Sequence, residues 1–216
     1  MAGARPEASI GRIQRPAVNE RIHDLAVVGS AFGGSLLAGM VRQMGRSVVL
    51  IERGRHPRFA IGESSTPLTN LLLEELAAEH GIPELATFAK WGSWRRHHPE
   101  VGVGLKRGFT FYHHIPGSPW TRRADQANEL LVAASPNDEV ADTHWYRPDF
   151  DAYWADHALR SGVEYWDETE VTEFDETPEG IRLNGQRRGE SVSVRARFLV
   201  DATGPRGFLF QQFGWK

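Results

Sequence analysis

The most constraining feature of this sequence is a glycine-rich turn between a short apolar run and a helical pattern. Residues 25–28 are uninterrupted apolar sequence, typical of a strand buried on both faces, and the turn GSAFGG follows over residues 29–34. Apolar residues then recur at helical spacing as far as Met44, and a second apolar run, VVLI, covers residues 48–51. Strand, turn, helix and strand within about 30 residues predict a βαβ unit with a right-handed crossover, and hence an α/β fold with parallel strands.

The turn itself reads G-x-A-x-x-G, a pattern that favours dinucleotide binding. Gly29 allows the tight turn after the strand, Ala31 lets the backbone approach a pyrophosphate, and Gly34 lets the helix lie close to the sheet. Together with Ser30, these residues form a turn that exposes the N–H groups at the start of the helix, and those groups attract phosphate. Glu52 follows at a spacing of about 20 residues, which suits a carboxylate bonded to a ribose diol. An acid there favours FAD or NAD over NADP, and a purely structural turn is the alternative.

Composition excludes several classes of function. The chain has 25 basic and 28 acidic residues, and this slight acidic excess argues against nucleic-acid binding. It contains no cysteine, which excludes disulfides and thiolate metal sites, and no histidine spacing predicts a metal site. No apolar stretch is long enough to span a bilayer. Residues 1–22 lack periodicity and the apolar core of a secretory signal, so we expect a flexible arm, a cytoplasmic location and one domain over residues 23–216.

Two more helices are predicted beyond the βαβ unit. Pro67 is placed to open a helix whose leucines share one face, namely Leu68, Leu71, Leu72 and Leu76. Apolar side chains over residues 150–158 recur at i, i+3, i+4, i+7 and i+8, the pattern of an amphipathic helix. The segment GFTFYHH, over residues 108–114, alternates instead like a strand.

The last third of the chain reads as β-structure. Residues 165–195 alternate like a small β-meander, with turns expected at residues 179–180 and 184–185. Residues 198–200 then form one more buried strand, which ends at Asp201. Taken with the βαβ unit, this pattern predicts a parallel sheet flanked by helices, with a meander attached to it.

Three further motifs resemble those of a known family. The segment IGESSTP, over residues 61–67, looks like the G-E-[SA]-x-x-P signature that follows the second strand in flavin-dependent halogenases and related monooxygenases. WYRPDFD, over residues 145–151, is similar to that family's entry into a helix, and DATGPRG, over residues 201–207, resembles its D-[AC]-[ST]-G-x-R-G turn. With the glycine turn, they follow the family's order. The chain therefore resembles the N-terminal portion of the FAD-dependent monooxygenase/halogenase superfamily, and within it the tryptophan-halogenase-like proteins.

The resemblance implies a Rossmann-like FAD-binding domain and a set of residues around its cofactor. Beyond the glycine turn and Glu52, the positions that would contact FAD are Arg53, Gly62, Glu63, Ser64, Arg147, Val171, Asp201 and Gly204. Arg53 and Val171 would lie near adenine, and the IGESSTP residues would line the flavin side. The alternative for Arg53 and Arg147 is a surface ion pair, and for Asp201 a turn cap.

The family's halogenases also use a lysine beside a tunnel that leads from the flavin. Lys106, in LKRGFTFY, is placed to open an alternating strand, and its K-x-G-x-x-F context resembles the lysine-bearing strand of those enzymes. Lys90, in FAKWGSW, lies nearer to the family's usual distance from Glu63. Burial lowers the pKa of a lysine and makes its free amine more available. We expect Lys106 to be catalytic, with Lys90 as the second candidate and a surface lysine without chemistry as the alternative for each.

The function implied by the resemblance is an oxidoreductase that acts on an aromatic or other electron-rich small molecule through a flavin hydroperoxide. A halogenase would also need oxygen, halide and a separate flavin reductase. The family's W-x-W-x-I-P and G-D motifs are absent, so we expect a domain that is incomplete at its C-terminus. A single-component hydroxylase or reductase of the same fold is the first alternative, a non-catalytic nucleotide-binding fragment the second, and an NAD-dependent dehydrogenase the third.

Overall fold

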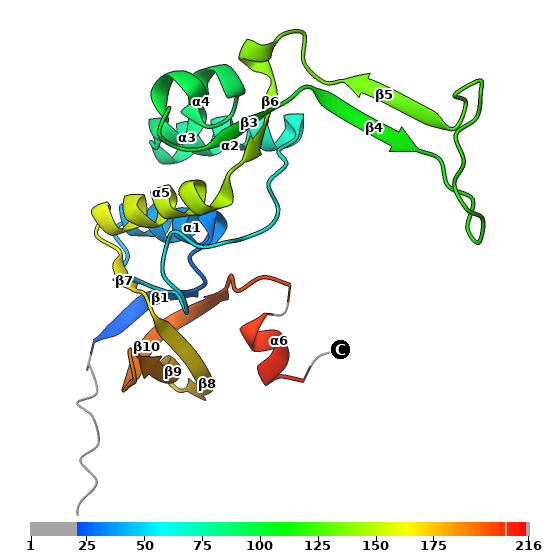
Figure 1. Ribbon diagram of the computed structural model, residues 1–216. Helices are drawn as coiled ribbons and strands as arrows, with labels where there is room; N and C mark the ends of the chain where they lie inside the picture. The colour runs from blue at the N-terminus through cyan, green and yellow to red at the C-terminus, as the bar shows by residue number, and fades with distance from the viewer. Residues whose placement is uncertain (1–20, 206, 215–216) are drawn as a thin grey trace, which may run out of the picture.

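The computed structural model describes residues 21–205 and 207–214, so most of the predicted arm lies outside the described residues (Figure 1). The predicted βαβ unit is confirmed: β1 (Ile22–Val28) leads through α1 (Phe32–Gln43) to β2 (Val48–Ile51). The two strands pair in parallel, with Leu25 opposite Val48. Their apolar runs are buried because the sheet is covered on both faces.

Six strands form the main sheet, in the order β7-β2-β1-β10-β9-β8. The strands not yet given are β7 (Glu164–Trp166), β8 (Thr169–Thr177), β9 (Gly180–Arg187) and β10 (Glu190–Asp201). The long β10 runs antiparallel to β9 and then parallel to β1, so the strand expected at residues 198–200 is its far end. Its expected burial is wrong, because Phe198 is 71% exposed and Leu199 and Val200 are only half-buried. The predicted α/β fold, with a parallel core and an antiparallel meander, is confirmed.

One predicted turn of the meander is wrong. Residues 184–185 lie inside β9. The glycine at position 185 allows two strands to approach closely and does not form a turn. A side chain at Gly185 would collide with the carbonyl oxygen of Glu170 on β8. The chain reverses instead at Arg188 and Gly189, which both have positive φ, of 52° and 85°.

Two long helices cover one face of the sheet. Helix α5 (Arg147–Arg160), the predicted amphipathic helix, packs beside α1 against the parallel strands (Figure 1). Apolar residues of both helices meet the sheet in one core, which includes Val27, Leu50, Ala38 and Ala158. The opposite face of the sheet is covered by residues of the meander and by Phe208 of the short helix α6 (Phe208–Gln212).

Three further helices pack above this layer, and they share an aromatic core with α1 and α5. They are α2 (Pro67–His80), α3 (Pro83–Thr87) and α4 (Trp91–His97). The rings of Phe88, Trp94, Phe150 and Trp154 are fully buried among them. Edge-to-face contacts between these rings, such as 4.7 Å between the centroids of Phe88 and Trp94, fix how the helices meet.

Helix α2 begins at Pro67 as expected, but of the four leucines on its predicted face only Leu76 packs, partly buried, against the core. Leu68, Leu71 and Leu72 are exposed, whereas Leu73 and Ala77 are buried. The buried stripe of the helix also includes Asn70, whose side chain donates to Asp142 at 2.7 Å.

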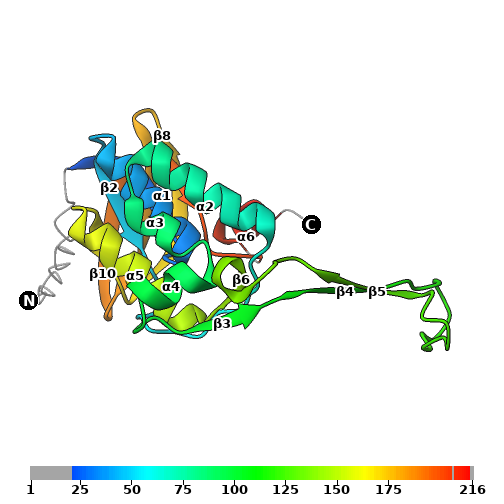
Figure 2. The same ribbon diagram turned by 90° about the horizontal axis from the view of Figure 1, so that it is seen from above.

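The remaining strands form two small antiparallel pairs. β3 (Val103–Lys106) pairs with β6 (Asp142–Trp145), which follows the 3-10 helix Asp138–Val140, and β4 (Gly108–Tyr112) pairs with β5 (Glu129–Ala133). The β4–β5 hairpin extends far from the rest of the molecule (Figure 2). Its register places Phe109, Phe111, Leu130 and Val132 on one apolar face.

Candidate nucleotide site

The site is built around the turn between β1 and α1, at the carboxyl end of the parallel strands. Gly29 has a φ of +106°, and a side chain there would collide with the carbonyl oxygen of Ala202. A side chain at Gly34 would collide with the carbonyl oxygen of Gly29. The N–H of Gly29 donates to the carbonyl of Ile51 at 2.7 Å, and that of Ala202 donates to Val28 at 2.8 Å. Backbone segments approach so closely here that only glycine fits at both positions.

The start of α1 is open to an anion. Its N-cap residue, Ala31, offers no side-chain cap, and the first turn of the helix contains no acidic residue. A Cβ at Gly33 would meet only open space. The first N–H groups of a helix lack acceptors within the helix, and they carry the positive end of its dipole. Asp151 of α5 accepts one of these N–H groups, that of Phe32, at 3.2 Å. The rest of the cradle contains no side chain and fits a pyrophosphate.

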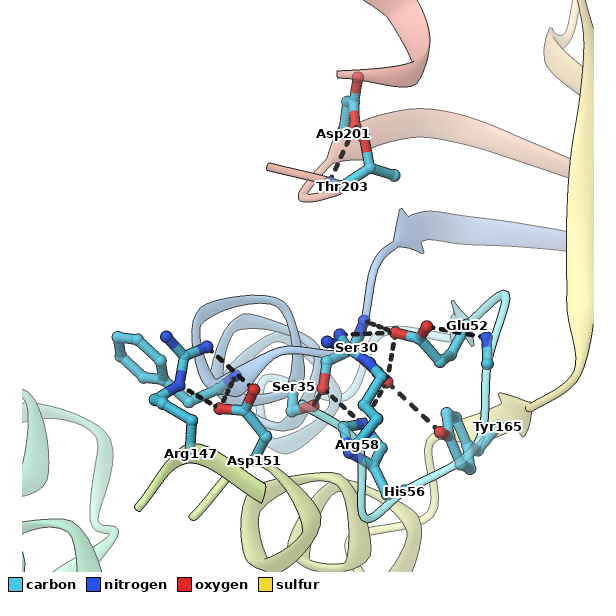
Figure 3. Close-up of polar contacts among 12 residues, drawn as sticks. Ser30, Ser35, Glu52, His56, Arg58, Arg147, Asp151, Tyr165, Asp201 and Thr203 are labelled. Carbon is cyan, nitrogen blue, oxygen red and sulfur yellow. Dashed lines mark hydrogen bonds and ion pairs between the residues drawn. The ribbon is translucent and has the colours of Figure 1, made fainter. Parts of the chain in front are cut away.

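Glu52 lies directly beside the turn, where the sequence places it, and its side chain is buried. Oε1 accepts the N–H of Gly54 at 2.9 Å, and Oε2 accepts both the N–H and the hydroxyl of Ser30 at 3.0 Å (Figure 3). Arg58 donates to Oε2 from 3.0 Å. Burial alone would raise the pKa of Glu52, but these hydrogen bonds and Arg58 outweigh it, so the pKa is lowered. The carboxylate is therefore ionised at neutral pH, and its contact with a ribose stays a prediction.

The segment expected on the flavin side runs as an extended loop along β6. Gly62, Glu63 and Ser64 are all exposed, and Gly62 has a φ of +96°. The backbone of Ser64 pairs with His144, and the N–H of Trp145 donates to the carbonyl of Glu63 at 2.7 Å. Strand β6 thus fixes the course of this loop, and its polar side chains are exposed, with Oε2 of Glu63 accepting the N–H of Gly62 at 3.1 Å.

Arg147 is buried, so the alternative of a surface ion pair is wrong for this residue. Its Nε and one terminal nitrogen donate to Asp151, and the other terminal nitrogen donates to the carbonyls of Ile61 at 2.7 Å and Gly62 at 3.1 Å. Each guanidinium nitrogen therefore has an acceptor in the protein. A contact with FAD stays a prediction, and it would add to these bonds or replace one of them.

The predicted positions on the adenosine side lie close to Glu52. Arg53 is exposed beside a shallow recess that Arg55, Glu168 and Arg188 also line. Val171, on β8, is half-buried, and its strand is tied to the site because the N–H of Thr169 donates to the carbonyl of Glu52 at 2.9 Å. Direct contacts of Arg53 and Val171 with adenine stay predictions.

Asp201 caps the turn that follows β10. Its Oδ1 accepts the N–H and the hydroxyl of Thr203 at 3.0 and 2.6 Å (Figure 3). Its Oδ2 accepts the N–H of Leu209 at 2.8 Å. Gly204, in the same turn, has a φ of +96°. The turn-capping role that the sequence left open for Asp201 is therefore present. Arg206 of this motif lies outside the described residues.

The two candidate lysines have different surroundings. Lys106 ends β3 and does not open an alternating strand, because Arg107 separates β3 from β4. Its buried amine donates to the carbonyl of Ser65 at 2.5 Å, and burial lowers its pKa against the opposing effect of Asp142. Lys90 precedes α4, its side chain is 37% exposed, and its amine pairs with Glu74 at 2.5 Å.

Several residues at this site were missed by the sequence reasoning. His56 and Arg58 bond to Ser30 and Glu52, and Asp151 accepts the N–H of Phe32 at the start of α1. The run ERGRHPRF between Glu52 and the IGESSTP segment carried a usable signal, since polar residues there must lie near the second strand's end. Tyr165, far away in sequence, could be found only from the fold.

Some alternatives find no support in the part of the chain that the structure covers. Among the described residues, no group of three or more histidines, cysteines or acids is arranged to hold a metal ion. The same residues include no helix with both the length and the apolar character needed to cross a bilayer.

Known proteins are similar to this chain over most of its length. A family model described as an FAD binding domain matches residues 23–216. The halogenase PrnC of Pseudomonas fluorescens, which acts on monodechloroaminopyrrolnitrin, is 31% identical over 88% of this chain and 32% of its own length. The tetracycline 7-halogenase of Kitasatospora aureofaciens is 30% identical over 90% of this chain and 34% of its own. Halogenase PltM, crystallised with phloroglucinol and FAD, superposes with a TM-score of 0.73 at 25% identity, over 89% of this chain and 36% of its own. The chain thus spans about a third of the length of these relatives.

Proposed function

Because this chain belongs to the FAD binding domain family, and PltM, a halogenase that it resembles, was crystallised with FAD, we propose that it binds FAD at the turn between β1 and α1. The observation that carries this proposal is the cradle at the turn. There, side chains at Gly29 and Gly34 would strike backbone, and the first turn of α1 has no side-chain cap at Ala31 and no acidic residue of its own. Such a cradle accepts the pyrophosphate of a dinucleotide.

The residues around the cradle have distinct roles in this proposal. Glu52 accepts hydrogen bonds from the adenosine ribose, and its charge disfavours a ribose with a 2′-phosphate. The loop at Gly62–Ser64 lies on the flavin side, and Arg147 holds that loop through the carbonyls of Ile61 and Gly62. Bound FAD, once reduced, supplies the electrons that activate oxygen. The protein's part is to bind and orient the cofactor and to shield it from water.

We propose further that the reaction served by this domain is halogenation of an electron-rich aromatic molecule. The support is the kinship with PrnC, with the tetracycline 7-halogenase and with PltM, which was crystallised with phloroglucinol. A separate reductase would supply reduced flavin. The chain spans about a third of these relatives' length. Halogenation should therefore be assayed with this chain and with any longer form of the protein, and the variants below are made in the form that converts substrate.

A lysine amine would hold hypohalous acid against the substrate, and Lys106 is our first candidate. Its amine is buried beside Ser65, next to the loop proposed for the flavin side, and its pKa is lowered by burial. Lys90 is the second candidate, since its side chain is more accessible and is paired with Glu74. The amine of Lys106 must leave the carbonyl of Ser65 before it can meet an oxidant, so the two lysines are to be tested together.

FAD binding is tested by titrating the purified chain with FAD, FMN or NAD. Binding of the two flavins is monitored by flavin fluorescence, and binding of NAD by calorimetry. FMN lacks the adenosine monophosphate half of FAD, which carries the ribose that Glu52 would bind and one of the two phosphates that the glycine turn would bind. We expect saturable binding of FAD and much weaker binding of FMN and NAD. Equal binding of FMN, or no binding of FAD, would contradict the proposal.

The alternatives make different predictions. Product that forms without halide would favour a hydroxylase or reductase of the same fold, with Lys106 as a structural residue. FAD binding without any turnover, in every form of the protein, would favour a non-catalytic nucleotide-binding domain. Preference for NAD over FAD in the titration would favour a dehydrogenase.

A further inference from the structure

Ser30 is the meeting point of a buried polar network beneath Glu52. Its side chain is fully buried at the first position after Gly29. Its Oγ lies 3.0 Å from Oε2 of Glu52, 2.8 Å from Nε2 of His56 and 3.3 Å from the hydroxyl oxygen of Tyr165 (Figure 3). Three segments, namely the end of β2, the loop after it and β7, thus converge on one hydroxyl group.

The hydrogen-bonding capacity of these groups determines the direction of each bond. An ionised carboxylate only accepts, so the hydroxyl of Ser30 donates to Glu52. A hydroxyl group has one proton to donate and two lone pairs, so Oγ accepts from both His56 and Tyr165. His56 must then carry its proton on Nε2, which also faces the carbonyl oxygen of Ser30 at 3.0 Å. Its Nδ1 is buried and has no partner among the described residues.

We propose that Ser30, His56 and Tyr165 are positioning residues that hold the Glu52 carboxylate for the ribose of the bound nucleotide. This inference rests on the proposed binding of FAD. The N–H and hydroxyl of Ser30 both donate to Oε2, while the N–H of Gly54 holds Oε1, so the carboxylate plane is fixed before a ligand arrives. A group that is already ordered loses less entropy on binding, and affinity rises accordingly.

Arg58 is the fourth donor to this carboxylate, and its side chain is 28% exposed, whereas Ser30 is fully buried. Three of the four donors reach Oε2, and only the N–H of Gly54 reaches Oε1. Each carboxylate oxygen has two lone pairs, so Oε1 keeps one for a ribose hydroxyl. The Ser30 network on Oε2 therefore stays in place when nucleotide binds.

The network can be tested first without any ligand. Nitrogen-15 NMR of the parent chain at neutral pH should show His56 neutral and protonated on Nε2. Ser30→Ala should shift the His56 resonances, because Nε2 loses one of its two acceptors. A His56 that is protonated on Nδ1, or that is cationic at neutral pH, would overturn the proposed directions.

The positioning role is tested by an FAD titration of Ser30→Ala, Glu52→Gln and the double variant. We expect Ser30→Ala to weaken FAD binding by about tenfold, since it removes a hydrogen bond to a charged group. In the Glu52→Gln background the same change should weaken binding by about twofold or less, because Ser30 acts through Glu52. Tyr165→Phe should give a smaller loss in the same direction.

Ser47 provides a matched control at the other end of the sheet. Its N–H and hydroxyl both donate to Oδ2 of Asp24 at 2.9 Å, the same arrangement that Ser30 makes with Glu52. Ser47→Ala should leave FAD affinity unchanged. An equal loss from Ser30→Ala in both backgrounds, or a loss from Ser47→Ala, would overturn the positioning role alone. A parent chain that binds no FAD would overturn the proposed function and this inference with it.

Discussion

Arg147 binds Asp151 one helical turn away through two hydrogen bonds, of 2.8 Å from Nε and 2.9 Å from a terminal nitrogen. The side chains are only 7% and 0% exposed. Asp151 also accepts the N–H of Phe32 at 3.2 Å, and Arg147 donates to the carbonyl of Ile61. One buried ion pair therefore connects α5, the start of α1 and the loop that leads to Gly62.

We expect Arg147→Ala to destabilise the fold strongly. It leaves the Asp151 carboxylate buried and unpaired, and breaking such a pair costs about 3–5 kcal/mol. Urea denaturation followed by tryptophan fluorescence measures the change in the free energy of unfolding.

A second ion pair on the same helix serves as the control. Arg160 binds Asp156 with the same spacing, at 2.8 Å, but both side chains are 61% exposed. Arg160→Ala should change stability little, because exposed pairs contribute little. Equal effects of the two variants would show that burial is not what makes the Arg147 pair important.

The second prediction compares two glycines of α1. A Cβ at Gly34 would strike the carbonyl oxygen of Gly29, whereas one at Gly39 would lie 3.8 Å from Nδ1 of His157, an ordinary contact. Gly34→Val should abolish flavin retention, and Gly34→Ala should weaken it, because the helix start must move away from the turn. Gly39→Ala should retain flavin and gain about 0.5–1 kcal/mol, since alanine is the better helix residue. The absorbance of the purified variants at flavin wavelengths decides between these outcomes.

Local signals made the core of this fold predictable. The apolar runs, the glycine turn and Glu52 follow one another within one βαβ unit. The close approach that requires glycine at position 29 comes instead from Ala202, far away in sequence. Helix α2 shows the limit of such signals. Its leucines suggested one buried face, but the position of α3 buries Leu73 and Ala77 and exposes Leu71.

The same limit applies to the site. The position of Glu52 followed from spacing alone, whereas its partners depend on tertiary structure. Tyr165 reaches Ser30 only because β7 pairs with β2, and no periodicity in the sequence predicts that pairing. Gly185 suggested a turn, although its true constraint is the backbone of Glu170 on the neighbouring strand.

The third prediction concerns the charge of Glu52. Glu52→Gln keeps the size of the side chain but removes the charge, so hydrogen bonds from the ribose lose their ionic partner. Such bonds contribute about 1.5–3 kcal/mol, or roughly ten- to a hundredfold in affinity. Calorimetric titration with FAD should show a loss within that range. Unchanged affinity would place Glu52 outside the site.

The fourth prediction is a loss of stability in mild acid. Burial lowers the pKa of four histidines below the ordinary value of 6.5, namely His23, His56, His98 and His157. The unfolded chain therefore binds more protons than the folded protein between the two pKa values. The contribution of these neutral histidines to the free energy of unfolding should be complete above about pH 6.5 and should fall as the pH drops below that value.

Denaturation at pH 7.5 and pH 5.5 tests this prediction. His23 is almost fully buried, and neither ring nitrogen has a hydrogen-bond partner among the described residues, although Glu164 lies 3.5 Å from Nε2. His23→Gln should reduce the difference between the two pH values. A free energy of unfolding that is equal at both would contradict the assignment of neutral, buried histidines.

The last prediction separates the two lysines. In the form of the protein that turns over substrate, Lys106→Ala should abolish halogenated product, because no amine would hold the oxidant, while FAD binding and peroxide production from reduced flavin should persist. Lys106→Arg should fail almost as badly, since a guanidinium stays charged and offers no free amine. Lys90→Ala is the matched control and should stay active, because it only breaks the half-exposed pair with Glu74. The reverse pattern moves the role to Lys90 and leaves Lys106 as the residue that ties β3 to Ser65. Product that depends on neither lysine nor on halide would replace the halogenase proposal with the hydroxylase one.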